Sequence, residues 1–508
     1  MDITDIQPRA EKAGRRAWLG LAALALPVLV ISIDFSVLNL ALPKLATDLS
    51  PTSAEQLWIL DIYGFMIAGF LVTMGTLGDR IGHRRLLLAG AAAFAGSSVL
   101  AAFAVNPAML ILARALLGIA GATLAPSGLA LVTAMFPDPA QRAGAVAAFT
   151  GCFMGGAILG PIAGGLLLAH FWWGSVFLLA VPVMVMLLIA GPILLPESRT
   201  RDAGRPDPIS VVLSLAAVLP AVYGITELAR DGRNPGAWVA LVVGAVAGFA
   251  FVRRQRRLPD PLIDVSLFGN RIFRGAFGSS LVTGMMQGGA ILMINLFLQS
   301  VLGLSTLRAG LWLVPPALAM LVTIGASPVL AQRFRPAYII ATGMVVSAVG
   351  YATLTLVTAD GGLPLLVTGF AVAMAGIGPG LALGYDLVLG AAPPERAGAA
   401  SGTMESGGQF GVAAGVAVLG SIGAAVYRNE IQLPDGLPPE AAAHAGDSVT
   451  GAAAVTPGLP SVLADGVRSA ADAAFTVGLH TVSAISAVAF VLLAVVAVVA
   501  FREVGPRK

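Results

Sequence analysis

The sequence predicts an all-α integral membrane protein with fourteen membrane-spanning helices. Three observations predict this fold class. Of the 508 residues, 57% are hydrophobic and only 11% are charged, whereas a soluble domain carries about 25% charged residues. The mean hydropathy is +0.88. Apolar runs of about 20 residues, the length that crosses a bilayer as a helix, recur along the whole chain.

Each predicted span is an apolar run whose ends are marked by charged residues, Pro or Gly. The pair Asn106-Pro107 separates two neighbouring runs, and the run 236–252 is short. In chain order, the spans are predicted at 17–43, 55–77, 86–105, 108–135, 143–168, 173–195, 208–229, 236–252, 273–300, 308–331, 337–357, 363–390, 398–427 and 475–501.

The distribution of Lys and Arg predicts the orientation of these spans. With the N-terminus in the cytoplasm, most of the 30 Lys and Arg residues fall in inner segments, as the positive-inside rule requires. A miscounted span would disturb this alternation, so the bias supports both the count and the orientation. We expect a multi-pass protein of the cell (inner, cytoplasmic) membrane with both termini in the cytoplasm. The first apolar run is too long for a cleavable signal peptide and contains Asp34.

The composition excludes several classes of protein. A single cysteine, Cys152, excludes an intramolecular disulfide framework and a multi-cysteine metal site. The four His residues show no HExxH spacing, so we expect no metal site. No GxxxxGK[ST] phosphate-binding loop is present, which excludes ATP hydrolysis by this chain. The net charge of +3 is small and gives no indication of nucleic-acid binding. We therefore expect neither an enzyme nor a cofactor.

The long outer segment at about 428–474 differs in composition from the rest of the chain. It is rich in Pro, Ala, Gly and acidic residues. One interpretation is a flexible outer loop, and the other is an ordered hairpin or short helices that shape an outer vestibule. Asp447, Asp465 and Asp472 would attract cations to it, although salt limits that attraction to about 8 Å.

A motif occupies the turn between the second and third spans. Gly permits a tight turn between helices, and Asp79 lies beside several Arg, where a charge-assisted bond can latch neighbouring helices. The motif resembles the GxLaDrxGrkxxl signature of the major facilitator superfamily. This resemblance assigns cytoplasmic gating to Gly75, Asp79, Arg80, Gly82, Arg84 and Arg85; a merely basic inner loop is the alternative. Asp386, near the inner end of span twelve, is expected to act as a further latch.

Two more spans carry residues that resemble motifs of this superfamily. In span four, Arg114 and Gly118 match the RxxxG motif. Span five is similar to the antiporter motif GxxxGPxxGG, which the family associates with antiport rather than symport. Such a helix has a smooth face for close packing and a backbone that proline weakens. The matching residues are Gly156, Gly160, Pro161, Gly164 and Gly165.

Motifs in the first two predicted spans resemble those of particular branches of this superfamily. Residues 33–43 resemble the LDxTvvNvALP motif of fourteen-span drug:H⁺ antiporters, and 58–63 resemble the WxxDxY pattern of the quaternary-ammonium-compound multidrug efflux branch. The resemblance covers essentially the whole chain. It implies a major facilitator fold of 6+2+6 helices: a six-helix bundle at 1–200, a two-helix insert at 201–260 and a pseudo-symmetric second bundle at 261–508. We expect a monomer.

Charged side chains within the spans are candidates for function, because each costs roughly 2.5–3.5 kcal/mol at the bilayer centre. Asp34, Asp61 and Arg114 fall at similar depth in the outer half. A structural ion pair is the alternative, but one Arg cannot neutralise two acids. Glu405 faces the second-half cavity or forms a structural pair. We assign proton and cation coupling to Asp34, Asp61, Glu405 and Arg114.

Large apolar side chains near these acids are candidates to surround a lipophilic cation. An aromatic face over a cation contributes roughly 0.5–2 kcal/mol. Helix packing or anchoring at the membrane interface is the alternative for each residue taken alone. The candidates for a substrate cavity are Phe35, Trp58, Tyr63, Met286, Trp312 and Phe410.

The resemblance and the charges together imply an antiporter that exports lipophilic cationic drugs, including quaternary ammonium compounds, from the cytoplasm. The proton gradient is the expected energy source, and the expected partners are protons, small cationic molecules and the lipid bilayer. One alternative keeps the fold and exports an endogenous antibiotic or metabolite. The other is a membrane receptor or scaffold that transports nothing.

Overall fold

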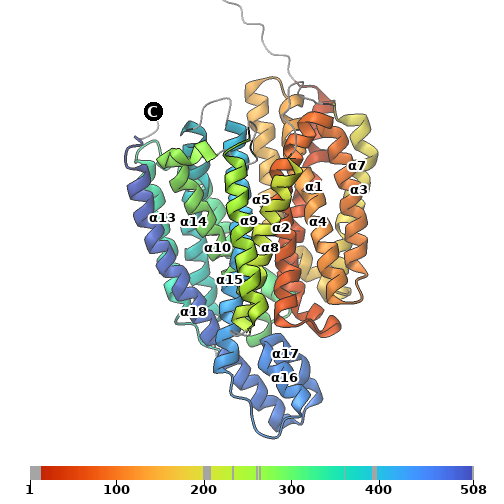
Figure 1. Ribbon diagram of the computed structural model, residues 1–508, viewed down its shortest axis with the longest axis vertical. Coiled ribbons are helices and arrows are strands. Elements are labelled where there is room, and N and C mark those ends of the chain that lie inside the picture. The colour runs from red at the N-terminus through yellow and green to blue at the C-terminus, as the bar shows by residue number, and fades with distance from the viewer. Residues whose placement is uncertain are drawn as a thin grey trace, which may run out of the picture.

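The computed structural model describes residues 13–197, 207–230, 234–258, 261, 265–359, 361–391 and 397–505. The regular structure in these ranges is helical throughout, without a strand. Most of the long helices lie side by side along the long axis of the molecule (Figure 1). Two short helices, α16 and α17, project beyond them at one end, which we call the hairpin end.

Each predicted span falls within one or two helices. The bounds are α1 (Arg15–Leu49), α2 (Ser53–Ile81), α3 (His83–Ala102), α4 (Pro107–Met135), α5 (Pro139–His170), α6 (Ser175–Leu178), α7 (Ala180–Leu194), α8 (Pro208–Arg230), α9 (Pro235–Gln255), α10 (Arg271–Leu296), α11 (Thr306–Trp312), α12 (Val314–Leu330), α13 (Pro336–Leu354), α14 (Leu363–Ala391), α15 (Ala397–Glu430), α16 (Pro439–Asp447), α17 (Val449–Val455) and α18 (Ser461–Phe501).

Within the described residues, 13 helical segments are long and apolar enough to cross a membrane. The remaining predicted span, 143–168, lies in α5. Two shorter apolar stretches, Gly144–Phe153 and Leu159–His170, occur in this helix. The all-helical membrane fold is therefore established, while the count of fourteen spans stays a prediction.

Proline interrupts two of the predicted spans. The span at 308–331 divides at Leu313 into α11 and α12, and α12 has proline in its first turn. The span at 173–195 divides at Leu179 into α6 and α7, three residues before Pro182. Proline has no backbone N–H and clashes with the preceding turn, which weakens a helix at that point. Other helices, among them α1, α4 and α5, continue through internal prolines.

The helix contacts fall into two similar groups. In the first, α1 packs on α5, α2 on α4, and α3 on α4 and α7. In the second, α10 packs on α15, α12 on α14, and α13 on α14 and α18. The two groups meet where α2 packs on α15 and where α5 packs on α11. The predicted boundaries near 200 and 260 lie outside the described residues, so the proposed division into bundles stays a prediction.

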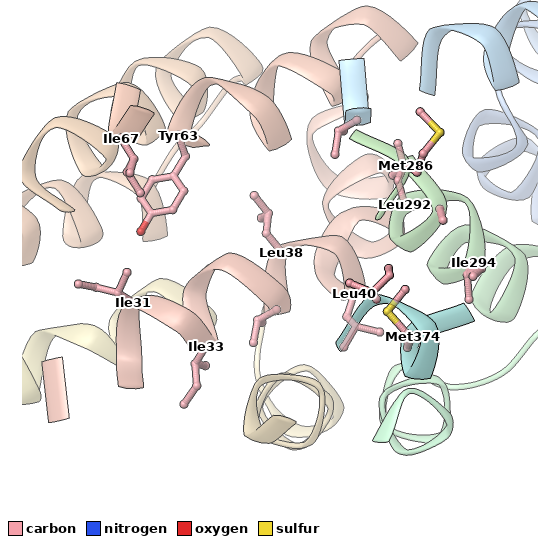
Figure 2. Close-up of a cluster of buried hydrophobic side chains, with 14 of the residues drawn as sticks. Ile31, Ile33, Leu38, Leu40, Tyr63, Ile67, Met286, Leu292, Ile294 and Met374 are labelled. Carbon is pink, nitrogen blue, oxygen red and sulfur yellow. The ribbon is translucent and has the colours of Figure 1, made fainter. Parts of the chain in front are cut away.

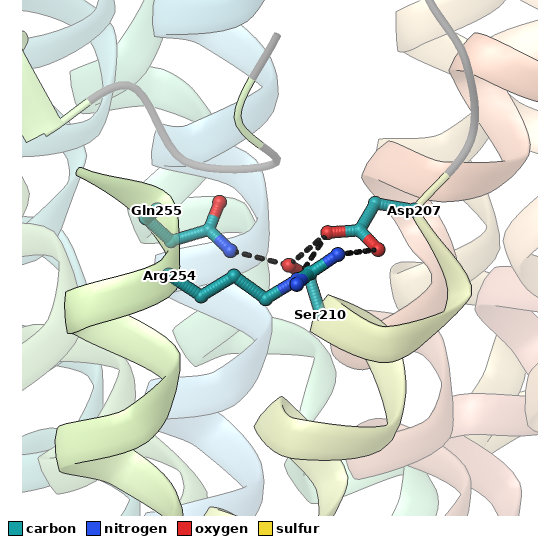
Figure 3. Close-up of polar contacts among 4 residues, drawn as sticks. All are labelled: Asp207, Ser210, Arg254 and Gln255. Atoms are coloured by element: carbon teal, nitrogen blue, oxygen red, sulfur yellow. Dashed lines mark hydrogen bonds and ion pairs between the residues drawn. The ribbon is translucent and has the colours of Figure 1, made fainter. Parts of the chain in front are cut away.

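The insert consists of α8 and α9, which pack on each other, while α8 also contacts α2 and α15. A polar cluster joins its two helices at the end away from the hairpin end (Figure 3). Arg254 donates to both carboxylate oxygens of Asp207 at 2.8 and 2.9 Å. Ser210 donates to Asp207 at 2.6 Å, and Gln255 donates to Ser210 at 2.6 Å.

The segment 428–474 is largely helical, so the interpretation as a flexible loop is wrong. The ordered alternative holds: α15 continues to Glu430, α16 and α17 follow, and α18 begins at Ser461, 14 residues before the predicted start of its span at 475. Ser448 caps α17 by accepting a hydrogen bond from Gly451 N–H. The many Ala residues of this segment have high helix propensity, a signal that its Pro and Gly content hid.

Apolar side chains cover much of the outer surface of the long helices. Only 11% of the apolar window of α9 is buried, and exposed side chains there include Trp238, Val242 and Phe249. Such a surface suits a hydrocarbon solvent, in which each helix satisfies its own backbone hydrogen bonds. The structure therefore agrees with a multi-pass membrane protein.

Candidate functional site

A buried ion pair connects α1 and α4 in the first group of helices. The guanidinium of Arg114 donates from Nη1 to Asp34 Oδ2 at 2.9 Å. Arg114 is 1% exposed and Asp34 is 6% exposed. Because both charges are removed from water, neither is stable here without the other. The structure thus brings together two of the four residues assigned to coupling.

The same guanidinium is also held by α2. Its Nε donates to the carbonyl oxygen of Ile59 at 3.3 Å, and its Cζ lies 4.3 Å from the centre of the Tyr63 ring. The Phe177 ring lies on another side, at 5.9 Å. A planar guanidinium can donate and stack at the same time, which an ammonium group cannot. Arg114 therefore joins α1, α2 and α4 at one point.

Asp61 is buried without a partner in the described structure. The residue is 2% exposed, and neither carboxylate oxygen has a hydrogen bond. The guanidinium of Arg114 bonds to Asp34 and makes no hydrogen bond to Asp61. An ionised carboxylate in such a position costs several kcal/mol, whereas a neutral carboxyl costs far less. The packing around Asp61 is therefore compatible with its protonated form.

The neighbours of Asp61 place it at the junction of the two helix groups. Leu57 and Phe65 lie one turn before and one turn after it, and residues four apart share a helix face. Both contact α15: a Cβ at Gly420 would lie 2.7 Å from Leu57 Cδ2, and the rings of Phe65 and Phe410 are 5.9 Å apart. Asp61 thus faces α15 across the contact that separates the groups, which we call the α2–α15 seam.

Glu405 lies on α15 in the second group. Its hydrogen bonds are to residues of this group and not to the other three coupling candidates. The hydroxyl of Tyr385 on α14 donates to its Oε2 at 2.5 Å, and Gln409 donates to its Oε1 at 3.1 Å. Both partners donate from neutral groups, a phenol and an amide. Neither Tyr385 nor Gln409 was predicted as a site residue. The i, i+4 spacing of Glu405 and Gln409 was the available signal.

The five candidates for a substrate cavity whose side chains are described do not gather in one place. Trp58 and Phe410 pack with Val218 and Leu219 of α8 around a small apolar cluster that includes Phe65. Tyr63 is fully buried against Arg114. Met286 is buried in the main core, and Trp312 is 42% exposed on α11. The side chain of Phe35 lies outside the described part of the structure.

Apolar side chains fill the centre of the molecule between the two groups (Figure 2). Leu38 and Leu40 of α1 lie there near Leu292 of α10, while Met286 and Met374 lie close by. All of these labelled residues belong to the same core cluster. The groups are thus in apolar contact along the half of α1 that leads to the hairpin end.

The motif between α2 and α3 forms a tight turn with ionic contacts. Gly82 links the helices with φ 107°, a value that L side chains rarely adopt. Asp79 lies 3.0 Å from His83 Nε2. Arg84 and Arg85 lie 3.5 and 3.8 Å from Glu197, beyond the end of α7. Arg80 is exposed and Gly75 approaches Pro126 of α4, while Asp386 of α14 is half-buried.

The glycines of α5 allow close approach on two sides. A Cβ at Gly156 would overlap the carbonyl oxygen of Leu29, and one at Gly164 would lie 2.7 Å from Val37, both on α1. A Cβ at Gly165 would lie 2.6 Å from the Cα of Leu307 on α11. Gly160 and Pro161 are buried on the same helix. The motif residues thus pack α5 against its own group and against the other one.

The glycines of α15 repeat this arrangement in the second group. A Cβ at Gly411 would overlap the carbonyl oxygen of Leu281, and one at Gly415 would overlap that of Met285, both on α10. The pair α10–α15 therefore resembles α1–α5. Among the described residues, no group of three His, Cys, Asp or Glu side chains is arranged to hold a metal ion.

Comparison with known proteins decides the family. A family model described as Major Facilitator Superfamily matches residues 24–416. The chain belongs to this superfamily. It is a membrane transporter and not an enzyme.

The curated relatives of this superfamily member are efflux and resistance proteins. The multidrug efflux pump LfrA of Mycolicibacterium smegmatis is 42% identical over 496 residues, which cover 98% of each chain. The methyl viologen resistance protein SmvA of Salmonella typhimurium is 33% identical over 94% of this chain and 97% of its own. A tetracenomycin C resistance and export protein of Streptomyces glaucescens is 30% identical over 80% and 76%.

Solved structures of transporters show the same fold. A bacterial homologue of the human lysosomal transporter Spinster, in an inward-facing and unoccupied conformation, has a TM-score of 0.67 at 19% identity and covers 96% of this chain and 98% of its own. The peptide transporter POT in complex with sulfate has a TM-score of 0.64 at 16% identity, with coverage of 96% and 95%. At such identities the likeness concerns the fold alone.

Proposed function

We propose that this superfamily member is a proton-coupled antiporter that exports lipophilic cationic drugs, including quaternary ammonium compounds, from the cytoplasm. In this proposal α5 also crosses the membrane, which brings the number of spans to fourteen. The spans form a 6+2+6 arrangement in a monomer of the cytoplasmic membrane. Both termini lie inside, so the hairpin end lies outside. The names of the relatives LfrA and SmvA support a multidrug and cationic cargo.

The observation that carries the proposal is the unequal state of two buried carboxylates in the first helix group. Asp34 is neutralised by Arg114, whereas Asp61 is equally buried and has no hydrogen bond. A structural ion pair explains Asp34 and leaves Asp61 unexplained. A carboxyl that must be neutral when the α2–α15 seam is closed, and that is charged when the seam is open to water, is a means of coupling protons to a conformational change.

The proposed cycle follows from this charge requirement. A proton from outside neutralises Asp61 and allows the seam to close, after which the cavity opens inward. A lipophilic cation then competes with the proton for the negative charge, and either one lowers the cost of closing the cavity again. An empty and ionised site changes conformation poorly, so the flux of protons and the flux of cations are linked.

The experiment that tests the proposal is efflux of ethidium from proteoliposomes under an imposed pH gradient. One positive charge moved across 100 mV corresponds to about 2.3 kcal/mol, so losing one proton per cycle lowers the sustainable cation gradient by more than about tenfold. We expect this loss in Asp61→Asn. Asp34→Asn should also weaken efflux, because it leaves the charge of Arg114 buried without its partner. Asp48→Asn removes an exposed carboxylate from the same end of α1 and serves as the control.

Wild-type gradients in both buried variants would refute proton coupling through these acids. An absence of gradient-driven efflux by the unmodified protein would refute the function itself. Both outcomes are read from the same preparation, because counterflow of labelled ethidium without a pH gradient shows whether the protein is folded and binds its cargo.

A second candidate function is export of an antibiotic or metabolite that the cell itself makes. The relative named for tetracenomycin C export favours it, and the fold and the coupling site are unchanged. Competition distinguishes the two cargoes. A cationic drug pump is inhibited by tetraphenylphosphonium at concentrations near the KM for ethidium, whereas an exporter of neutral or anionic metabolites is insensitive to it.

A further inference from the structure

A cavity lies between the two helix groups at the hairpin end. Its volume is about 50 Å³. The wall includes Leu57 of α2, Met293 of α10, Tyr427 of α15 and Phe475 of α18, and the segment from Asp447 to Thr450 covers it. Both groups and the α16–α17 hairpin therefore surround a common space here.

The wall of this cavity is apolar and adaptable. Gly420 and Gly423 form part of the α15 side, where a Cβ at Gly423 would lie only 2.8 Å from the sulfur of Met293. Without side chains at these glycines, the ends of Leu57 and Met293 form the surface. Methionine is flexible and polarisable, and it is common at sites that accept many ligands. Such a wall suits hydrocarbon groups of varied shape.

Negative charge accompanies the apolar wall. Asp447 lines the cavity. Asp472 lies one turn before Phe475 on α18, so it shares a helix face with a residue of the cavity wall. Arg428, the residue after Tyr427, is the basic side chain in the last turn of α15. Whatever pairs form among these three groups, their net charge is negative. The aromatic faces of Tyr427 and Phe475 are a further attraction for a cation.

Hydrogen bonds join the α16–α17 hairpin to the walls of the cavity. The hydroxyl of Thr450 donates to Gln56 Oε1 on α2 at 3.2 Å, and the hydroxyl of Tyr427 donates to the carbonyl oxygen of Ala445 at 2.8 Å. Pockets that enclose a drug-sized ligand measure about 300–1,000 Å³, so the cavity is in a contracted form. Movement of α17, a helix of seven residues, would enlarge it.

We propose that this cavity is an outer binding site for a lipophilic monovalent cation, occupied after the cargo leaves the centre of the protein and before its release. The apolar wall holds the hydrocarbon part, and Asp447 with Asp472 supplies the opposing charge. The proposal rests on the proposed function for the direction of transport and for the charge of the cargo.

The test is inhibition of efflux by cation added from outside. Intact cells that express the full chain are loaded with ethidium, and efflux is measured while external tetraphenylphosphonium is raised. In the double variant Asp447→Asn/Asp472→Asn, we expect the half-inhibitory concentration to rise at least about tenfold, which corresponds to ~1.4 kcal/mol. The half-inhibitory concentration of each variant is compared with its own efflux in the absence of inhibitor. Asp435→Asn/Asp465→Asn removes two exposed acids of the same segment and is the matched control.

A second variant tests the apolar wall independently of charge. Ala424→Phe places a ring in the cavity and should raise the half-inhibitory concentration in the same way. Unchanged inhibition in the charge variant overturns the proposal, even if Ala424→Phe fails to fold. An equal rise in the control variant also overturns it, because general surface charge then explains the effect. If the unmodified protein shows no gradient-driven efflux, the proposed function fails instead.

Discussion

At the scale of single residues, Arg114 connects structure and mechanism. Its guanidinium bonds to Asp34, donates to Ile59 and lies over the ring of Tyr63. Removing one partner of a buried ion pair leaves an uncompensated charge, whereas removing both avoids this cost. The pair is thus a structural element of the first helix group, and Asp61 is the group left to change its charge.

We expect Arg114→Met to lower the free energy of unfolding by about 3–5 kcal/mol. The double variant Arg114→Met/Asp34→Asn should recover part of this loss, because no charge is then left buried. Thermal unfolding of the purified protein in detergent, followed through the double-mutant cycle, measures the coupling. Additive effects of the two changes would contradict the pairing. Arg114→Lys should recover little, because an ammonium group cannot make all three contacts.

In the proposed mechanism, Asp61 controls the closing of the α2–α15 seam as well as transport. The Asn side chain has the size of the neutral carboxyl, so Asp61→Asn should favour the closed seam at every pH. A spin-label pair on the ends of α2 and α15 at the hairpin end would report a pH-independent short distance in this variant. The unmodified protein should show the longer distance increasingly as the external pH rises. A pH-dependent distance that persists in Asp61→Asn would exclude this carboxyl as the switch.

At the scale of helices, close packing depends on residues without side chains. Gly156 and Gly155 are neighbours on α5, yet they differ completely in their surroundings. A Cβ at Gly156 would overlap α1, whereas nothing lies within 4 Å of a Cβ at Gly155. The two positions therefore separate the effect of helix contact from the effect of helix propensity.

We expect Gly156→Ala to reduce thermal stability and transport, because α1 must shift away from α5. Gly155→Ala should be neutral or stabilising by up to about 1 kcal/mol, since Ala favours the helix more than Gly does. Unfolding temperatures of the two variants, measured side by side, test this. Equal behaviour of the pair would show that the α1–α5 approach is looser than the structure indicates.

The polar cluster of the insert makes a different prediction, which concerns pH. The hydrogen bonds from Arg254 lower the pKa of Asp207 to about 2, below its ordinary value of about 3.9. A carboxylate with a lowered pKa stabilises the fold above its unfolded pKa, and this contribution is lost as the pH falls through the folded pKa. The cluster is therefore fully effective between pH 5 and 8.

Asp207→Asn should accordingly lower the unfolding temperature by a similar amount at pH 5 and at pH 8. The pH profile of efflux over the same range should keep its shape, because Asp207 does not titrate there. A shifted profile would mean that the insert takes part in proton coupling. An unshifted profile would separate the role of Asp207 from that of Asp61.

At the scale of the whole molecule, the two helix groups and the α16–α17 hairpin meet at one end. Apolar contacts between α1 and α10, the α2–α15 seam and the bond from Thr450 to Gln56 all lie towards that end. Transport by alternating access requires these contacts to separate during part of each cycle. The hairpin must then move relative to α2.

A cross-link between Gln56→Cys and Thr450→Cys tests this requirement. Cys152 is first replaced by Ser, since it is the only cysteine of the chain. We expect a short bifunctional maleimide to stop efflux in the double-cysteine protein and to leave each single-cysteine protein active. Full activity after complete cross-linking would show that the hairpin stays attached to α2 throughout the cycle.

Much of this protein could be predicted from short segments of sequence. Hydropathy located the helices, because a helix in lipid satisfies its backbone within itself and needs no distant partner. The glycines of 156–165 and the turn at Gly82 indicated close packing for the same local reason. In contrast, the sequence left a flexible loop and short helices as alternatives at 439–455, because tertiary contacts such as the bond from Tyr427 to Ala445 hold these helices.

The sequence by itself determined the membrane class, the order of the helices, the superfamily and the presence of two acids and one base at similar depth. Only the tertiary structure decided that Arg114 pairs with Asp34, that Asp61 faces α15, and that Tyr385 bonds to Glu405. The depth of a side chain in the membrane can be estimated by counting residues along a single helix. The choice of partner depends on how each helix is rotated against its neighbours, which packing between distant parts of the chain decides.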